Sequence, residues 1–310
     1  MSSRNVPDYD DHLILKHSGP PTRLDHFLQQ QFPDISIQRW KLAIDTTEVM
    51  VDGRPGRKGT ILAENSCVSL PPWLPTSLTS RPPVPDSTVQ LDIIFENDEL
   101  LVINKPAGIH THPLSSDETG TLANGLAATY PKLNGIGFSP LQPGLLNRLD
   151  RDTSGLVLAA KTRESWDTYR QWFIQKEITK TYLGIVHGVL DEPLTIERPL
   201  IHHPRQHGKM TVHIPDTFHG RRLPAVTIIE PLHHSAATTR VQLTMKTGVM
   251  HQLRVHCAAV GHALVGDLVY GSPAHKNLDA QAGRLRLHAF RLRCPDGKQF
   301  TAPLNWDDWS

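Results

Sequence analysis

A cluster of prolines divides this chain into two unequal parts. Six of the 25 prolines fall within residues 71–88, whose sequence is PPWLPTSLTSRPPVPDST. Because proline lacks an amide donor and fixes φ, this stretch favours an extended, semi-rigid spacer over a helix or a central strand. We therefore expect an N-terminal module over residues 1–70, a linker over 71–88 and a larger domain over 89–310. A length of 310 residues is consistent with two domains.

The composition is that of an ordinary globular protein. Hydrophobic residues make up 38% of the chain, and 32 basic residues nearly balance 31 acidic ones. The apolar runs are far shorter than the ~18 residues of a membrane helix, and the N-terminus lacks the apolar stretch of a secretory signal. Three widely spaced cysteines, Cys67, Cys257 and Cys294, argue against a disulfide framework and predict a reducing, cytoplasmic environment.

The first 70 residues predict a small helix–helix–hairpin module. Apolar side chains at helical spacing predict one helix, capped by Thr22 and extending through Gln31, and a second over residues 37–44, capped by Ser36. Residues 48–54 are typical of a strand that turns at an Asp-Gly pair, with residues 68–70 closing the hairpin. A unit of this size is better suited to binding than to catalysis.

Beyond residue 88, strands dominate and single helices separate them. Residues 93–95 and 100–103 flank a polar turn and predict a hairpin, and residues 155–160 are typical of a buried strand. Thr162 then caps a helix, and residues 180–189 alternate as the two faces of a strand do. This order favours an α+β fold, built on a mixed, mostly antiparallel sheet with flanking helices.

One polar turn stands immediately before the predicted buried strand. Residues 147–155 have the sequence NRLDRDTSG. A carboxylate on a rigid loop beside an apolar strand can act as a nucleophile or a general base, and Asp150 and Asp152 are the candidates. The alternative is a structural turn in which these carboxylates pair with Arg148 and Arg151, which is the commoner outcome for an isolated aspartate.

A second candidate segment lies at the start of a predicted helix. Residues 247–256 have the sequence TGVMHQLRVH, and we expect a helix over 250–260 that stops at Gly261. At 100° per residue, His251 and Arg254 lie close together, away from the apolar stripe. An arginine there could bind a carboxylate or a phosphate through two parallel hydrogen bonds, and the alternative is an exposed arginine at a helix start.

Basic residues concentrate near the C-terminus although the total charge is almost zero. Residues 240–300 hold nine lysines and arginines against three aspartates, a local excess of six positive charges. Alternation of leucines with arginines predicts a strand that presents one face to a polyanion, or simply a solvated face. Its arginines are Arg284, Arg286, Arg291 and Arg293. The histidine and cysteine spacings match no zinc site and no phosphate-binding glycine loop occurs, so we predict neither a metal nor a cofactor.

Taken together, these segments resemble the RluA-type RNA pseudouridine synthase family. Residues 147–155 match its signature HRLDxxTSG except at the first position, and residues 180–188 match KxYxAxVxG with one glycine in place of alanine. Residues 247–271 match the family segments TGRxHQIRVH and GDxxYG. The likeness extends from about residue 91 to 309. Residues 22–70 resemble the RNA-binding domain named for ribosomal protein S-four.

The resemblance implies a reaction and the residues that perform it. The reaction is isomerisation of uridine to pseudouridine in RNA, without a metal or a cofactor. Asp150 would be the catalytic residue, Arg254 would pair with it and keep it ionised, and Tyr182 would pack on the uracil. The other expected substrate contacts are Arg148, His251 and Gln252, and the expected contacts to RNA elsewhere are Arg39, Lys41, Arg57, Lys58 and Arg151.

The resemblance also implies partners. Large-subunit ribosomal RNA is the expected substrate, transfer RNA is the second candidate, and we expect a monomer that binds no membrane. Because the total charge is close to zero, recognition should depend on RNA shape more than on nonspecific attraction to phosphates.

Two positions depart from the family pattern. Asn147 replaces a histidine and Val249 replaces a basic residue, and we expect both changes to alter RNA docking rather than the chemistry of Asp150. They motivate one alternative, a non-catalytic RNA-binding or ribosome-assembly protein that keeps the fold, against which the intact motif residues argue. Another alternative, a glycoside hydrolase, would need a second carboxylate about 5–10 Å from the first, and Asp152 is the near candidate in sequence.

Overall fold

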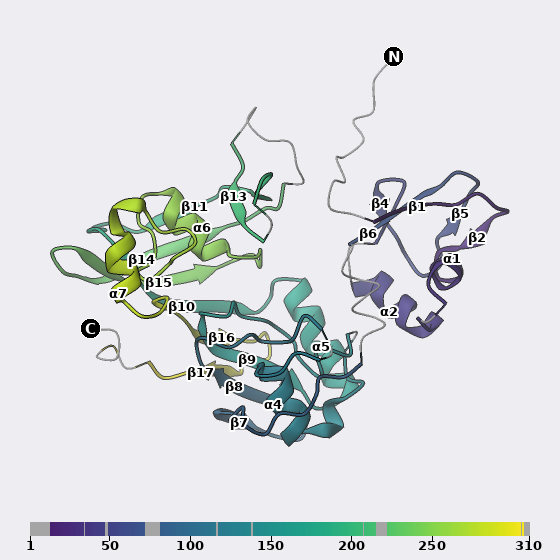
Figure 1. The fold of residues 1–310 in the computed structure, drawn as a ribbon, viewed down its shortest axis with the longest axis horizontal. Helices are drawn as coiled ribbons and strands as arrows, with labels where there is room; N and C mark the ends of the chain where they lie inside the picture. The colour runs from purple at the N-terminus through teal and green to yellow at the C-terminus, as the bar shows by residue number, and fades with distance from the viewer. Residues whose placement is uncertain are drawn as a thin grey trace, which may run out of the picture.

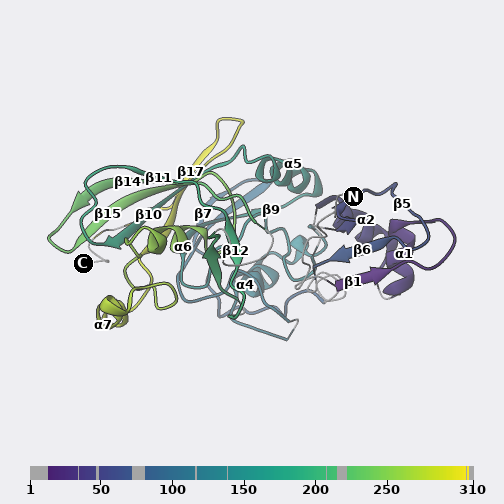
Figure 2. The same ribbon diagram turned by 90° about the horizontal axis from the view of Figure 1, so that it is seen from above.

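The fold consists of a small N-terminal unit and a larger unit built on one long sheet (Figures 1 and 2). Much of the predicted linker, residues 72–80, lies outside the described residues, as do residues 1–12. The computed structural model describes residues 13–33, 35–46, 49–71, 81–115, 117–137, 139–206, 208–214, 222–304 and 306.

The N-terminal unit has a hydrophobic core of its own. Helices α1 (Leu24–Gln31) and α2 (Ile37–Thr46) bury Leu28 and Trp40 against a small sheet of strand order β1-β6-β3-β4. Leu42 of α2 packs instead against the core of the larger unit. The strands are β1 (Leu13–Lys16), β3 (Met50–Val51), β4 (Arg54–Pro55) and β6 (Cys67–Leu70), with β2 (Thr22–Arg23) paired to β5 (Ile61–Leu62).

The hairpin and the second helix cap of this unit were both foreseen. Strands β3 and β4 turn at Asp52 and Gly53, whose φ angles of 50° and 76° suit the tight turn of a two-residue hairpin. The predicted closing strand is β6, which pairs with β3 on its other side. The backbone amide of Arg39 donates to the Ser36 hydroxyl at 3.4 Å, which confirms Ser36 as a cap.

The start of the first helix differs from the prediction. Thr22 does not cap it, because Thr22 and Arg23 form β2 and are held extended by their pairing with β5. Helix α1 begins at Leu24 without a side-chain cap. The Leu24 amide donates instead to the carbonyl of Thr60 at 2.9 Å. This bond, just before β5, satisfies an amide at the helix start that a capping side chain would otherwise have bound.

In the larger unit, nine of the described strands form one sheet. Their order is β11-β14-β15-β10-β16-β9-β8-β7, with β17 beside β16, and only β9 and β16 run parallel. The predicted mixed, mostly antiparallel sheet is therefore confirmed. The strands are β7 (Ile93–Glu96), β8 (Leu100–Lys105), β9 (Ser154–Ala160), β10 (Thr179–His187), β11 (Leu194–Ile196), β14 (Thr227–His234), β15 (Thr238–Met245), β16 (Leu287–Arg293) and β17 (Gln299–Thr301).

Helices cover both faces of this sheet. Alternate residues of β8 separate into two cores, with Leu101 facing α4 and α6 and Leu100 facing α5. Thr162 caps α5 as predicted, in a reciprocal box with Ser165. None of the described helices is long and apolar enough to cross a membrane. The helices are α4 (Leu122–Thr129), α5 (Arg163–Ile174), α6 (Gln252–Ala259) and α7 (Lys276–Gln281), with short 3₁₀ turns at Pro131–Leu133 and Pro273–His275.

The last part of the proline-rich stretch is not a free spacer. The Asn124 side chain donates to the Val84 carbonyl at 2.9 Å, and the Gly120 amide donates to the Asp86 carboxylate at 3.1 Å. These bonds attach residues 84–86 to the start of α4. The larger unit therefore begins a few residues earlier than the predicted boundary at residue 89.

A bulge in β16 explains the sequence pattern of its arginines. Thr181 pairs with Arg291 and Tyr182 with Ala289, so Phe290 is an extra residue on the bulged strand. The alternation of leucines with arginines therefore changes from odd-numbered to even-numbered leucines at the bulge: Leu287 is buried before it and Leu292 after it, although His288 is buried as well. The predicted arginine-bearing strand was too long at its start, because β16 begins only at Leu287.

The parallel contact between β9 and β16 predicts a glycine requirement. Gly155 has φ +111°, and a Cβ built on it would lie 2.3 Å from the carbonyl oxygen of Ala289. We expect Gly155→Ala to lower the free energy of unfolding by about 3 kcal/mol in urea denaturation, because the β16 backbone must move. Gly59→Ala is the control, since no atom lies within 4 Å of its Cβ. An equally small effect of both changes would contradict this packing.

Candidate active site

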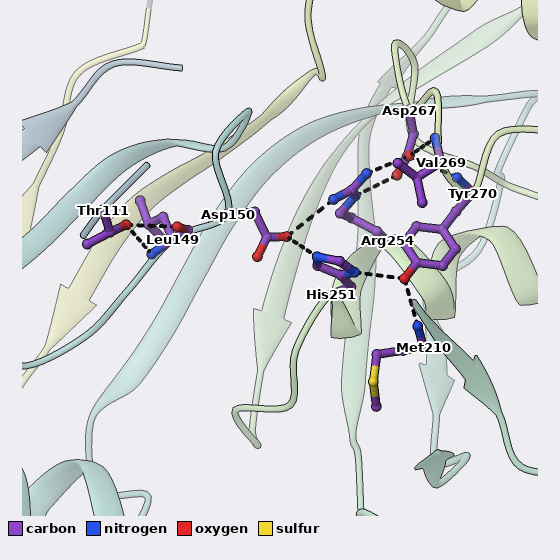
Figure 3. Close-up of polar contacts among 9 residues, drawn as sticks. All are labelled: Thr111, Leu149, Asp150, Met210, His251, Arg254, Asp267, Val269 and Tyr270. Carbon is purple, nitrogen blue, oxygen red and sulfur yellow. Dashed lines mark hydrogen bonds and ion pairs between the residues drawn. The ribbon is translucent and has the colours of Figure 1, made fainter. Parts of the chain in front are cut away.

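Asp150 lies on a loop whose backbone is fixed on both sides. The Thr111 hydroxyl donates to the carbonyl of Leu149 at 2.8 Å and accepts from the amide of the same residue at 3.0 Å (Figure 3). The Thr153 amide donates to the carbonyl of Asp150 at 3.1 Å, just before β9 begins. The carboxylate itself stays accessible, with 22% of its side chain exposed. The loop therefore presents one carboxylate in a defined position.

A buried lysine ties this loop to its neighbour. Lys105 is fully buried at the end of β8, and its Nζ donates to the carbonyls of Pro106, Ile109 and Arg151 at 2.7, 2.9 and 3.1 Å. Three acceptors match the three N–H bonds of an ammonium group. Burial lowers the pKa of Lys105 to about 8, while the charges of Asp152 and Asp150 oppose that shift. Lys105 is therefore a structural cation beneath the candidate carboxylate.

The arginine of the second segment is buried rather than solvated. Arg254 on α6 forms two parallel hydrogen bonds with Asp267, each 2.8 Å long, and the Asp267 carboxylate is fully buried. Its remaining terminal nitrogen, Nη1, lies 3.5 Å from Oδ2 of Asp150 (Figure 3). Asp267 thus holds the guanidinium, and the guanidinium is aimed at Asp150.

Mutual charge and hydrogen bonding keep Asp267 and Arg254 ionised. Burial alone would raise the pKa of Asp267, but the hydrogen bonds and charge of Arg254 outweigh it and lower that pKa. Burial would likewise lower the pKa of Arg254, and Asp267 and Asp150 raise it instead. The amides of Val269 and Tyr270 donate to Asp267 at 2.9 and 3.0 Å, which completes its shell.

Two aromatic side chains and a histidine complete the site. His251 places Nε2 3.8 Å from Oδ2 of Asp150, and its Nδ1 lies 2.7 Å from the Tyr270 hydroxyl. Tyr182 of β10 is buried, and both burial and the charge of Asp150 raise the pKa of its hydroxyl. The guanidinium of Arg254 also lies 5.1 Å from the centre of the Tyr270 ring. Residues from β10, α6 and three loops thus meet at one carboxylate.

The remaining predicted site residues fall into two groups. Arg148 and Arg151 are exposed beside the loop of Asp150, where Arg151 donates to the carbonyl of Gly108 at 3.0 Å. Gln252 is buried, and its amide group bonds to Thr247, Val226 and Thr227 and to the amide of Val249. Gln252 therefore orders the turn before α6 and does not face the carboxylate.

Basic side chains of the N-terminal unit lie together. Arg23 bonds to Asp25 at 2.8 Å, and Lys41 lies 3.9 Å from the same carboxylate. Lys58, in the turn after β4, lies 2.5 Å from Asp45 of α2. Arg39 of α2 and Arg57, which precedes Lys58 in the sequence, are also exposed.

Asn147 has a structural role in this fold. Its side-chain amide donates to the carbonyl of Leu156 at 3.2 Å and its oxygen accepts from the amide of Leu158 at 2.8 Å. The side chain of Asn147 thus binds the backbone of β9, and the expected effect of this departure on RNA docking stays a prediction. Val249, the other departure, packs on the small core beside α6.

Sequence reasoning missed several residues that hold the site. Asp267 and Tyr270 belong to the matched segment GDLVYG, and Lys105 belongs to NKPAG, but residue spacing does not indicate which groups they contact. Arg284 was expected on an exposed strand face. It donates instead to the Ser154 hydroxyl at 2.8 Å, beside the start of β9.

Comparison with known proteins identifies the family of this chain. The family model described as RNA pseudouridylate synthase matches residues 99–259. An uncharacterised RNA pseudouridine synthase of Synechocystis is 32% identical over 285 residues, which cover 90% of this chain and 84% of that protein. The ribosomal large subunit pseudouridine synthase D of Escherichia coli K12 is 31% identical, over 87% of this chain and 82% of that protein.

Solved structures agree at the level of the fold. The human RNA pseudouridylate synthase domain containing 1 aligns with a TM-score of 0.61 at 26% identity, over 72% of this chain and 88% of that one. The human domain containing 4 aligns with a TM-score of 0.55 at 22% identity, over 70% and 90%, and supports the fold alone. This chain belongs to the RNA pseudouridylate synthase family, and it is an isomerase that acts on RNA.

The pair of Asp267 and Arg254 predicts a pH-dependent contribution to stability. We expect Asp267→Asn to lower the free energy of unfolding by about 3–5 kcal/mol at pH 7, because it leaves a buried guanidinium without its partner. Since the pKa of Asp267 is lowered in the folded state, the contribution is present above the unfolded pKa and is lost as pH falls through the folded value.

Urea denaturation between pH 7 and pH 3 measures this contribution. The difference between wild type and Asp267→Asn should shrink on acidification. Asp167→Asn is the matched control, because its side chain is 56% exposed in a surface pair with Arg163 and should change stability by less than about 1 kcal/mol. A loss from Asp267→Asn that is no larger than the loss from the control would refute the assignment.

Proposed function

We propose that Asp150 is the catalytic residue and that the enzyme isomerises uridine in large-subunit ribosomal RNA. The observation that supports the catalytic assignment is the buried guanidinium of Arg254, which Asp267 holds with its third nitrogen 3.5 Å from the accessible Asp150 carboxylate. A fixed cation at that position attracts the carboxylate and restricts its orientation.

The reaction rearranges two bonds to the same ribose carbon. The bond from C1′ to N1 of uracil breaks, the base turns, and a bond from C1′ to C5 forms. The hydrogen on C5 leaves as a proton and N1 gains one, so the product is an isomer of the substrate. An ionised Asp150 either attacks C1′ or stabilises the positive charge that develops on the ribose. Tyr182 packs on the detached uracil and restricts its movement.

The target nucleotide has to leave its stack before Asp150 can reach the ribose. Arg148 is exposed on the same loop, two residues before Asp150, and is placed to contact the RNA backbone or to fill the space that the nucleotide vacates. Asp150 and the exposed Arg148 therefore lie on one loop, with the cation of Arg254 beside Asp150. This loop would serve both the extrusion of the nucleotide and the chemistry.

The ribosomal substrate is supported by the relatives. Proteins named ribosomal large subunit pseudouridine synthase D, from Neisseria meningitidis and Escherichia coli, are 31–33% identical to this chain over 87% of its length. Transfer RNA remains the second candidate. We propose that the N-terminal unit is an S-four-like RNA-binding domain, which the basic group around Lys41 and Lys58 supports. A monomer in the cytoplasm completes the proposal, and the three free cysteines suit a reducing compartment.

Removing the carboxylate tests the catalytic assignment. We expect Asp150→Ala to reduce pseudouridine formation at least about 10³-fold while RNA affinity changes little, because the carboxylate serves chemistry rather than phosphate binding. Mass spectrometry of ribosomal RNA fragments after incubation measures the product. Asp152→Ala is the matched control and should keep most of the activity. Equal product from Asp150→Ala and wild type would contradict the assignment.

Reversing charge on the N-terminal unit tests its role in binding. We expect the double variant Arg39→Glu and Arg57→Glu to weaken binding of ribosomal RNA about 10-fold or more, since each charge contributes to phosphate contact. The rate at saturating RNA should stay within about threefold of wild type. Lys298→Glu, in the turn between β16 and β17, is the control. Unchanged affinity in the double variant would remove this unit from RNA recognition.

A further inference from the structure

His251 stands in an unusual backbone position beside the catalytic carboxylate. It is the residue before α6 and has left-handed backbone angles, φ 53° and ψ 17°. Such angles are costly for a residue other than glycine and occur at functional sites more often than elsewhere. They direct one edge of the imidazole towards Asp150 and the other towards Tyr270 (Figure 3).

The hydrogen bonds of Tyr270 favour one of the two neutral tautomers of His251. The backbone amide of Met210 donates to the Tyr270 oxygen at 2.9 Å, so that oxygen already acts as an acceptor. The hydroxyl proton of Tyr270 is then available for Nδ1 of His251, at 2.7 Å. An Nδ1 that accepts leaves the proton of a neutral imidazole on Nε2, the nitrogen that faces Asp150.

The surroundings of His251 keep the ring neutral. Burial lowers its pKa, and the charges of Arg254 and Arg148 lower it further, while the charges of Asp150 and Asp267 oppose them. The net effect is a lowered pKa, so the imidazole is uncharged at neutral pH. Tyr270, the remaining titratable neighbour, has a pKa raised by burial and stays protonated.

The Nε2–H group of His251 faces Asp150, and no described side chain or backbone group accepts a hydrogen bond from it. Its distance of 3.8 Å from Oδ2 of Asp150 is too long for a hydrogen bond. A donor in this position is within reach of a base bound over the carboxylate. Uracil offers two carbonyl oxygens, and these take up negative charge when the bond from N1 to C1′ breaks.

We propose that His251 is a further catalytic residue, whose neutral Nε2–H group donates a hydrogen bond to a carbonyl oxygen of uracil as the base separates from the ribose. This role rests on the proposed function. No proton is transferred to or from the ring, so the proton balance of the isomerisation is unchanged. A preorganised neutral donor stabilises a developing oxyanion in the same way as an oxyanion hole does.

The tautomer depends on a hairpin outside the main sheet. Met210 begins β13 (Met210–Val212), which pairs with β12 (Leu200–His202). The buried Met210 packs in one core with Val255 of α6 and the ring of Tyr270. The hairpin therefore acts on the site through the amide of Met210, which binds the Tyr270 hydroxyl. If the hairpin moved away, Tyr270 could accept a hydrogen bond from Nδ1, and both tautomers of His251 would be populated.

Nuclear magnetic resonance of the full-length protein tests the tautomer independently of activity. Protein labelled with ¹⁵N-histidine at pH 7 should show a protonated Nε2 and an unprotonated Nδ1 for His251. The signal is assigned by its absence from His251→Gln. In Tyr270→Phe, which keeps the ring and removes the hydroxyl, we expect a mixture of both tautomers. An Nδ1–H tautomer or a doubly protonated ring in the wild type would overturn the inference.

Single-turnover kinetics test the donor. His251→Leu removes it and should slow the reaction about 100-fold at saturating RNA, with KM changed less than about threefold. His251→Gln places an amide donor near the same point and should recover at least tenfold of that loss. Both variants bear the same left-handed backbone cost, so a general loss of folding would affect both.

The possible results separate the two proposals. Wild-type rate in His251→Leu, or a defect confined to KM, overturns the donor role while Asp150→Ala remains inactive. A glutamine variant as slow as the leucine variant also overturns it. Full activity of Asp150→Ala would instead remove the proposed function on which the donor role rests.

Discussion

The paired hydrogen bonds between Asp267 and Arg254 are the interaction on which this site depends. Each of these bonds is 2.8 Å long, and the two charged groups are buried where neither could stand alone. The amides of Val269 and Tyr270 also bind Asp267. Asp267 therefore holds the guanidinium of Arg254, and with it the start of α6, in a fixed position relative to the loop after Gly266. That arrangement leaves one guanidinium nitrogen directed at Asp150, so the cation beside the proposed catalytic carboxylate is positioned by the buried pair.

The sheet brings the other side of the site to this pair. Strand β9 is buried along its whole length and begins directly after the loop of Asp150. Lys105, at the end of β8, donates to the carbonyl of Arg151 in that loop. Thr111 fixes the residue before the carboxylate. The proposed catalytic carboxylate is therefore held by backbone contacts of the larger unit, while Arg254 and His251 reach it from the start of α6. Among the described residues, the contacts of the site given above all come from the larger unit, and the N-terminal unit carries exposed basic side chains.

Local features were largely predictable from the sequence, and contacts between distant segments were not. Periodicity predicted the buried β9 and the capped α5. His251 and Arg254 do meet at Asp150, but the predicted helix start at residue 250 was wrong, because His251 precedes α6 with left-handed backbone angles. The loop of Asp150 drew attention because polar residues crowd before an apolar strand. Asp267 could not be assigned to Arg254, nor Lys105 to its three carbonyls, because spacing says nothing about which loops meet in space. Thr22 failed as a cap for the same reason, since pairing with β5 decided where α1 begins.

We propose that this chain converts uridine to pseudouridine at defined positions through Asp150. Mapping pseudouridines across all RNA of cells that have or lack the protein, with the gene restored as wild type or as Asp150→Asn, tests this directly. We expect one or a few pseudouridines of large-subunit ribosomal RNA to disappear without the protein, to return with the wild type and to stay absent with Asp150→Asn. An unchanged map in cells lacking the protein, or full restoration by Asp150→Asn, would contradict it.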